Sequence, residues 1–222
     1  MMGKRPAAFC GLCLCLCVFV VSSRCLAGEK TEIDNDWVRV LRLTQSPHEQ
    51  SALRDHPASV VVCLTEVHQK IINADGKAQN LRKRANDVAY FDAAKHGEEN
   101  VGDRPLEMIV VELKPNTAKA TGWPVTLDPV KLDPKHHPVP FENARVRVLR
   151  TILEPHVKSP MHEHPSYVVV YLTELHTTMT LSDGRKVDNP RKPGEVAWRD
   201  ALKHETENIG SKRAVEIQIE LK

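Results

Sequence analysis

Aromatic residues are scarce in this chain of 222 residues and make up 5% of it. An excess of one charge is missing as well, because 31 lysines and arginines stand against 29 aspartates and glutamates and leave a formal net charge of +2. This balance excludes a nucleic-acid or anionic-membrane binder that acts through bulk charge. Glycine-rich nucleotide loops, zinc-finger cysteine pairs and Ser-His-Asp-type nucleophile signatures are also missing from the sequence, so those function classes are not expected.

Cysteine becomes scarce too once the first 27 residues are set aside. Lys4 and Arg5 precede an uncharged apolar run that is too short for a comfortable bilayer span of about 20 residues. Small residues follow the run, a pattern typical of a secretory signal peptide, and cleavage is expected between Ala27 and Gly28. An uncleaved N-terminal anchor is the alternative interpretation.

Removal of this segment would leave Cys63 as the single cysteine, which excludes a disulfide within the mature monomer. Because Cys63 lies in an apolar run, we expect a small buried hydrophobe rather than a reactive thiol. The signal predicts a secreted or periplasmic protein with no stable membrane insertion after cleavage.

An internal repeat organises the rest of the chain. The sequence VRVLR of residues 38–42 recurs 108 positions later, at residues 146–150. At this offset, residues 33–114 align with residues 141–222 without a gap, and about two positions in five are identical. The chain is therefore a tandem duplication.

The duplication defines the predicted domains. Repeat 1 covers residues 28–114, and repeat 2 covers residues 141–222. Between them, residues 115–140 contain six prolines, which are expected to break any regular element and to form a linker, with an extended arm across repeat 2 as one option.

Within each repeat the hydrophobic period is two, as in β-strands. Asp75-Gly76 and Asp183-Gly184 each separate two such runs, which is a strong hairpin signal. No convincing amphipathic helix interrupts them. The predicted fold class is therefore all-β, with one sandwich or barrel per repeat.

The sharpest chemical motif is His162-Glu163-His164 in repeat 2. Residues two apart on a strand point to the same face, so both imidazoles can converge on one point while Glu163 points away. His204 lies on a later predicted strand and could complete a three-nitrogen metal site with open positions. Two solvent-exposed histidines and an unrelated third are the alternative. His136 and His137 in the linker are expected in a solvated turn, with an extra ligand as the other option.

At these motifs the sequence resembles the cupin superfamily, and the duplication makes it similar to a bicupin. His162, His164 and His204 match the three metal-binding histidines of the family, and Asn208 matches the asparagine that follows the last of them. The resemblance implies two tandem jelly-roll barrels. It also implies a divalent metal ion in repeat 2, with Fe, Mn and Zn as candidates.

The sequence departs from the family pattern in several respects, including Asp200 and Leu202 where the second motif has a proline and a glycine. Val168 and Val169 stand where the family has a glutamate ligand, and His156 stands where it has a leading glycine. The spacing before His204 is one residue shorter than usual, and a one-residue slip turns a strand side chain to the other face unless the preceding turn absorbs it.

Repeat 1 departs further. Arg54 replaces the first histidine, which leaves His56 and His96. A cation beside an arginine is disfavoured, so no metal is expected there. Arg54, His56 and His96 either bind an anionic group through the guanidinium or belong to a purely structural repeat.

Two functional hypotheses remain open. The first is a metal-dependent bicupin enzyme that acts on a small organic substrate. Dioxygenase-like oxidation is its leading reaction class, because the cupin resemblance includes three-histidine iron dioxygenases; decarboxylase and isomerase chemistry follow. The second is a non-catalytic cupin that binds a small molecule or is structural, which the eroded motifs favour. Both predict a small-molecule ligand and no nucleic-acid partner, and both leave a homodimer open.

Overall fold

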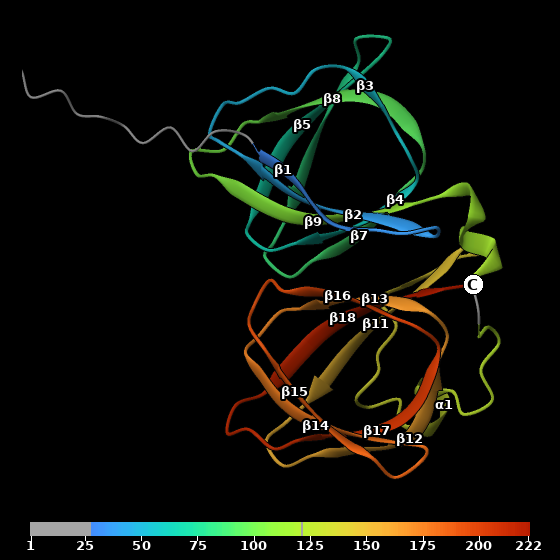
Figure 1. Cartoon of the computed structure of the whole chain (residues 1–222). Coiled ribbons are helices and arrows are strands. Elements are labelled where there is room, and N and C mark those ends of the chain that lie inside the picture. The colour runs from blue at the N-terminus through green and yellow to red at the C-terminus, as the bar shows by residue number, and fades with distance from the viewer. Residues whose placement is uncertain (1–27, 121) are drawn as a thin grey trace, which may run out of the picture.

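The computed structural model describes residues 28–120 and 122–222. The predicted signal peptide therefore lies outside the described residues. Each repeat forms a barrel of two antiparallel sheets, and the two barrels lie one against the other (Figure 1). The all-β fold with two tandem barrels is confirmed. No helix in the described ranges is long and apolar enough to cross a membrane.

Repeat 1 consists of a five-stranded and a four-stranded sheet. The first has the strand order β1 (Gly28–Asp34), β2 (Val38–Gln45), β9 (Leu106–Leu113), β4 (Ser59–Cys63) and β7 (Val88–Phe91). The second has the order β3 (Arg54–His56), β8 (Ala94–Asn100), β5 (Val67–Asn73) and β6 (Ala78–Lys83).

Repeat 2 reproduces this topology strand for strand. Its five-stranded sheet has the order β10 (Phe141–Glu142), β11 (Val146–Leu153), β18 (Ala214–Leu221), β13 (Tyr167–Tyr171) and β16 (Val196–Arg199). Its four-stranded sheet has the order β12 (Lys158–His164), β17 (Leu202–Asn208), β14 (Leu175–Leu181) and β15 (Lys186–Arg191).

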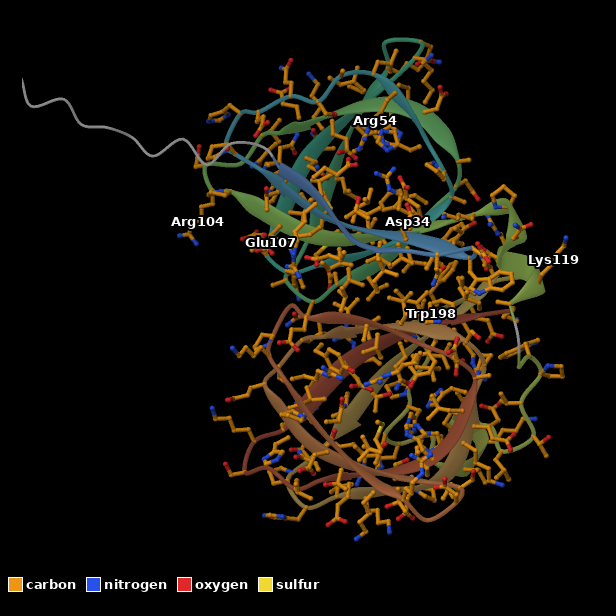
Figure 2. All side chains as sticks on the ribbon, viewed as in Figure 1. Asp34, Arg54, Arg104, Glu107, Lys119 and Trp198 are labelled. Carbon is orange, nitrogen blue, oxygen red and sulfur yellow. The ribbon has the colours of Figure 1, made fainter. Side chains whose placement is uncertain are left out.

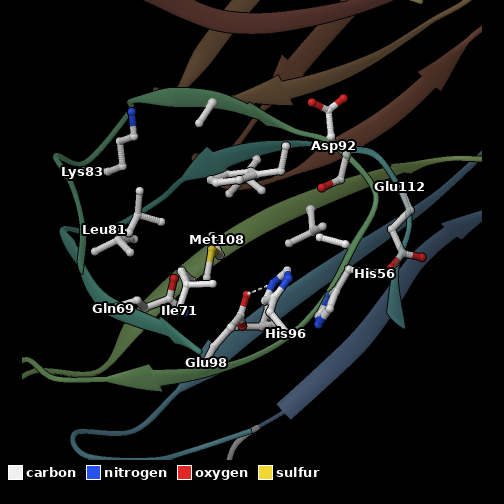
Figure 3. Close-up of a pocket in the computed structure, with 18 of the residues that line it drawn as sticks. His56, Gln69, Ile71, Leu81, Lys83, Asp92, His96, Glu98, Met108 and Glu112 are labelled. Carbon is white, nitrogen blue, oxygen red and sulfur yellow. Dashed lines mark ion pairs between the residues drawn. The ribbon is translucent and has the colours of Figure 1, made fainter. Parts of the chain in front are cut away.

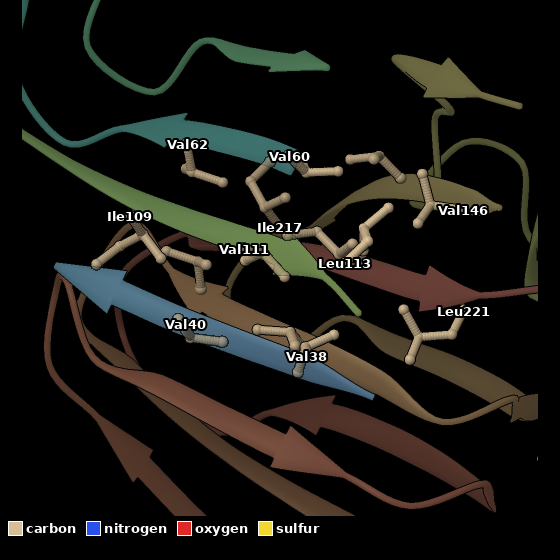
Figure 4. Close-up of a cluster of buried hydrophobic side chains, with 14 residues drawn as sticks. Val38, Val40, Val60, Val62, Ile109, Val111, Leu113, Val146, Ile217 and Leu221 are labelled. Carbon is tan, nitrogen blue, oxygen red and sulfur yellow. The ribbon is translucent and has the colours of Figure 1, made fainter. Parts of the chain in front are cut away.

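The inner strands of the five-stranded sheets are buried on both faces, which explains why every residue of β4 and β13 is buried and most of them are apolar. Alternate residues of each strand point either into their own barrel or toward the other barrel. The outward-facing residues of both repeats form one shared hydrophobic core between the barrels (Figure 4), made of Val38, Val40, Val60, Val62, Ile109, Val111, Leu113, Val146, Val148, Val168, Val170, Ile217, Ile219 and Leu221. Trp198 packs at the edge of this core, between the barrels (Figure 2).

Two equivalent arginines connect the barrels at the rim of this core. Arg42 of repeat 1 donates to the carbonyl oxygen of Gly194 in repeat 2. Arg150, which stands 108 positions after Arg42, donates to the carbonyl oxygen of Asn86, which stands 108 positions before Gly194. The interface is therefore arranged about a pseudo-two-fold axis, as expected when two copies of one sheet pack face to face.

The linker departs from the predicted lack of regular structure. A 3₁₀ helix spans Pro115–Lys119, and the short helix α1 spans Pro129–Leu132. In both, a proline occupies the first turn, where its missing N–H has no helical partner to lose. The prolines therefore begin these short helices instead of excluding them.

Candidate metal centre

Three histidines of repeat 2 converge inside its barrel. His162 and His164 lie two residues apart on β12, and His204 lies on the adjacent strand β17, directly opposite His162. One ring nitrogen from each of the three lies within 4.8 Å of the others. All three residues are buried. Among the described residues, this is the one group of three or more metal-ligating side chains with such spacing.

The pairing of β12 with β17 places His204 beside His162 despite the one-residue difference in spacing before His204. The pairing of β12 with β17 shifts between Ser159 and His162, so that Ser159 lies opposite Thr206 and His162 lies opposite His204. The extra residue is thus a β-bulge in β12, and His204 keeps its inward orientation. The sequence left the direction of His204 dependent on the preceding turn, and in the structure His204 faces the same point as His162 and His164.

The leading-glycine position of the motif retains a glycine-like backbone. His156 has φ of 63°, and its counterpart in repeat 1, His48, has φ of 59°. This left-handed conformation explains why glycine is the expected residue there. A histidine at this position keeps the turn at a cost in backbone strain.

Hydrogen bonds hold the imidazoles by their Nδ1 atoms. Nδ1 of His164 lies 2.7 Å from Oε1 of Glu220, and Nδ1 of His162 lies 2.6 Å from the carbonyl oxygen of Pro160. Donation from Nδ1 places the lone pair on Nε2. The Nε2 atoms of His164 and His204 are both buried without a hydrogen-bond partner.

Burial keeps these rings neutral. It lowers the pKa of His162, and together with the neighbouring imidazoles it lowers the pKa values of His164 and His204 well below the ordinary value. Unprotonated imidazoles are the form that binds metal ions. Buried, unpartnered and neutral nitrogens facing one point fit a divalent cation by their donor chemistry.

A network of charged side chains holds His164 in place. Glu220 on β18 accepts from His164 and also from Nε of Arg147, at 2.5 Å. Nη1 of Arg147 in turn donates to Asp128, the residue that caps α1. A carboxylate that orients the far nitrogen of a histidine ligand is a common arrangement in metal sites.

The linker supplies a fourth buried histidine. His137 is 1% exposed, so the expected solvated turn is wrong for this residue. Its ring packs edge-on against His162, with the centroids 5.2 Å apart, and its Nδ1 lies 3.1 Å from the carbonyl oxygen of Asp133. Burial and the nearby His162 lower the pKa of His137 to about 4. The segment around α1 is held on β12 by Glu163, whose Oε2 accepts from the backbone N–H groups of Thr126 and Leu127.

Two polar residues that the sequence interpretation did not consider also face the cavity of repeat 2. Glu216 and Gln218 on β18 line it together with His162 and His204. Nε2 of Gln218 donates to Glu216, yet burial raises the pKa of the Glu216 carboxyl to about 7. Their alternation with Ile217 and Ile219 is a period-two signal that separates the two faces of β18, although it does not say which face points into the barrel.

The three residues predicted in repeat 1 form a different arrangement. His56 and His96 stack face to face, with centroids 4.0 Å apart and planes 10° apart. Arg54 also lines the cavity of this barrel, and its Nη2 pairs with Glu29 of β1 at 2.8 Å. Cys63 is buried inside this barrel, and burial raises the pKa of its thiol to about 11, as expected for a packing residue.

No protein-family model and no curated protein matches the chain. Several solved structures resemble it over most of its length. AerE from Microcystis aeruginosa has a TM-score of 0.61 and 13% identity and covers 88% of this chain and 98% of its own. A variant of oxalate decarboxylase from Bacillus subtilis has a TM-score of 0.59 and 15% identity and covers 87% and 72%. The cupin 2 conserved barrel domain protein from Leptotrichia buccalis has a TM-score of 0.54 and 10% identity and covers 91% and 92%.

Proposed function

Because each of its two repeats has the cupin fold, we propose that the chain is a metal-dependent bicupin. Its ion is held in repeat 2 by His162, His164 and His204. The observation that carries the proposal is the pair of buried Nε2 atoms, on His164 and His204, that have no protein partner. A buried polar atom without a hydrogen bond is costly, and a metal ion would satisfy both of them. Another Bacillus subtilis oxalate decarboxylase structure is described as containing Mn(II) centres, which supports Mn(II) beside Fe(II) and Zn(II) as candidates.

A divalent ion at this site would supply a Lewis acid with open positions for an oxygen-bearing substrate. The residues of the chain divide the remaining tasks. Glu220 orients His164, and Arg147 balances the charge of Glu220 in the barrel wall. Glu216 faces the cavity with a carboxyl that titrates near neutral pH, which suits a group that holds or releases a proton there.

The size of the cavity limits the substrate. It measures about 20 Å³, close to the space of one or two water molecules. The linker residue His137 is part of its wall. A substrate of only a few non-hydrogen atoms therefore fits best. Within that limit we propose dioxygenase-like oxidation of a small organic molecule.

Metal content tests this proposal directly. The protein is produced with its own leader, purified without chelator or polyhistidine tag, and measured by inductively coupled plasma mass spectrometry. We expect a stoichiometric divalent metal in the parent, its loss in His162→Ala, and its retention in His56→Ala, the matched histidine variant of repeat 1. Less than about a tenth of an equivalent in folded parent protein, after metal loading, overturns the proposal.

A second candidate function is a non-catalytic module that binds a small molecule. The cavity of repeat 1 favours it, because it is far larger than the metal cavity, at about 260 Å³. Substrate screening of metal-loaded protein separates the two functions. Turnover by the parent that is lost in His162→Ala supports the enzyme, and no turnover by the parent supports the binding module.

We also propose export of the protein and cleavage before Gly28. The support is the positively charged start, the apolar run and the small residues before the cleavage position. Intact-mass spectrometry of the protein from the periplasm or medium tests this, and a mass that retains residues 1–27 contradicts it. Light scattering of the same sample shows whether the protein forms a homodimer, which the sequence leaves open.

A further inference from the structure

The barrel of repeat 1 encloses a cavity where the barrel of repeat 2 is filled. The cavity of about 260 Å³ lies between the two sheets of repeat 1 (Figure 3), whereas the cavity beside the metal centre measures about 20 Å³. Both barrels have the same strands in the same order. The difference must therefore come from side chains at equivalent positions.

Two inward-facing positions account for much of the space. Ser59 and Cys63 of β4 line the cavity of repeat 1. The residues 108 positions later on β13 are Tyr167 and Tyr171, which are 2% and 1% exposed and fill the second barrel. Two tyrosines thus occupy in one barrel the volume that a serine and a cysteine leave open in the other.

The walls of the two barrels also differ in polarity. Five apolar residues of repeat 1 that line its cavity stand at positions where repeat 2 has polar or charged residues. These positions pair Leu43 with Thr151, Leu81 with Asn189, Phe91 with Arg199, Met108 with Glu216, and Val110 with Gln218. Repeat 1 therefore lacks one of the three histidines of repeat 2 and has a mainly apolar interior, which is the property of a small-molecule site.

One end of the cavity is polar. His56 stacks on His96, and Nε2 of His56 is buried without a hydrogen-bond partner. Nε2 of His96 lies 3.4 Å from Oε1 of Glu98 (Figure 3). The unpartnered imidazole nitrogen leaves one hydrogen bond for a ligand to make.

The charges around this end disfavour an anionic ligand. Glu98 and Glu112 line it together with Asp92 (Figure 3). Two cations also line the cavity, but Arg54 is already paired with Glu29, and Lys83 lies away from the two histidines, on the side of Leu81 (Figure 3). A neutral ligand avoids repulsion from the carboxylates and still satisfies His56.

We propose that the barrel of repeat 1 binds a neutral, mainly apolar molecule of about one ring in size that carries a single hydroxyl or carbonyl group. The apolar body would lie against Leu81, Phe91 and Met108, and the polar group would bond to Nε2 of His56. The volume fits, because an apolar cavity of roughly 150 Å³ already binds benzene. Binding at this site does not require the metal of repeat 2.

Fluorine NMR with 4-(trifluoromethyl)phenol as the probe tests the proposal. We expect saturable binding to the full-length protein, weakened about tenfold or more in Cys63→Leu and in the double variant Ser59→Tyr with Cys63→Tyr, which copies repeat 2. His162→Ala is the matched control and should bind the phenol like the parent. That control separates failure at this site from failure of the metal proposal.

A second measurement does not depend on variants that fill the cavity. With methionine methyl groups labelled with ¹³C, the phenol should shift the signal of Met108 in the first barrel and leave that of Met179 in the second unchanged. The signals are assigned with Met108→Leu and Met179→Leu. No saturable binding at millimolar phenol, a shift of Met179 in place of Met108, or tighter binding of 4-(trifluoromethyl)benzoate than of the phenol overturns the proposal.

Discussion

Glu220 and His164 face each other inside the second barrel, with Oε1 of the carboxylate 2.7 Å from Nδ1 of the imidazole and both side chains without solvent exposure. They are 56 residues apart in sequence, on β18 and β12 of opposite sheets. The carboxylate fixes both the tautomer and the direction of His164, so that Nε2 points toward the other two histidines.

Replacing Glu220 by glutamine should therefore weaken metal binding without removing a ligand. We expect about 10–100-fold lower affinity, measured by competition with a fluorescent chelator. Glu112→Gln, the equivalent change in repeat 1, should leave the affinity unchanged. Circular dichroism of both variants checks that they fold, and equal affinities of Glu220→Gln and parent would contradict this role.

Acid should destabilise the metal-free protein. The pKa of His137 falls from its ordinary value of 6.5 to about 4 because the ring is buried beside His162. Between these values the unfolded chain binds more protons than the folded chain, so the stability present above pH 6.5 is lost as the pH falls toward 4. We expect His137 alone to contribute a loss of about 2–3 kcal/mol at pH 4.5.

Urea unfolding of metal-free protein at pH 7 and pH 4.5 measures this loss. His137→Phe keeps a ring of similar size without a titratable nitrogen, so its loss between the two pH values should be smaller by that amount. An identical pH dependence in variant and parent would show that His137 is protonated without cost.

Glu216 should have the opposite dependence. Burial raises the pKa of its carboxyl to about 7 from an ordinary value of 4.5. The folded chain therefore binds the proton more tightly, and its stability falls as the pH rises from 4.5 to 7. The free energy of unfolding of Glu216→Gln minus that of the parent should therefore be larger at pH 8 than at pH 5, by about 1–3 kcal/mol. Urea unfolding of the metal-free proteins tests this, and a pH-independent difference between them would refute it.

Tyr171 should be a major packing residue of the second barrel. Its side chain is 1% exposed, lies beneath the guanidinium of Arg191, and receives a hydrogen bond from Arg199 through its hydroxyl oxygen. Tyr171→Cys would place the residue of repeat 1 in this barrel, leave a cavity and cost about 3–5 kcal/mol. Cys63→Ala removes a much smaller group from repeat 1 and should cost about 1 kcal/mol. Denaturant unfolding of both variants checks the contrast, and equal costs would mean that Tyr171 does not fill its barrel.

Much of the fold was predictable because its signals are local or repeated. Alternation of apolar residues indicates strands, and Asp75-Gly76 and Asp183-Gly184 indicate hairpins. Each hairpin glycine has positive φ, at 78° for Gly76 and 84° for Gly184. The duplication could be detected by comparing the chain with itself. The three histidines of repeat 2 were identifiable because two of them share one strand.

The rest of the site depends on contacts between distant segments. His137 joins it only because the linker folds back onto β12, a path that the six prolines do not specify. His204 joins the site by pairing with His162 across two strands, and the spacing before His204 does not reveal this pairing. Glu216 and Glu220 alternate with isoleucines, but alternation does not say which face of β18 points into the barrel.

The sequence by itself determined that the chain is an all-β tandem duplication whose metal-ligating candidates are a few histidines of the second repeat. It could do so because strand period, turn residues and internal identity are properties of the sequence alone. Only the tertiary structure decided that the two copies have interiors of different kinds. Whether a barrel is filled, polar or hollow depends on the summed volumes and charges of side chains from nine strands, and those strands meet only in the folded protein.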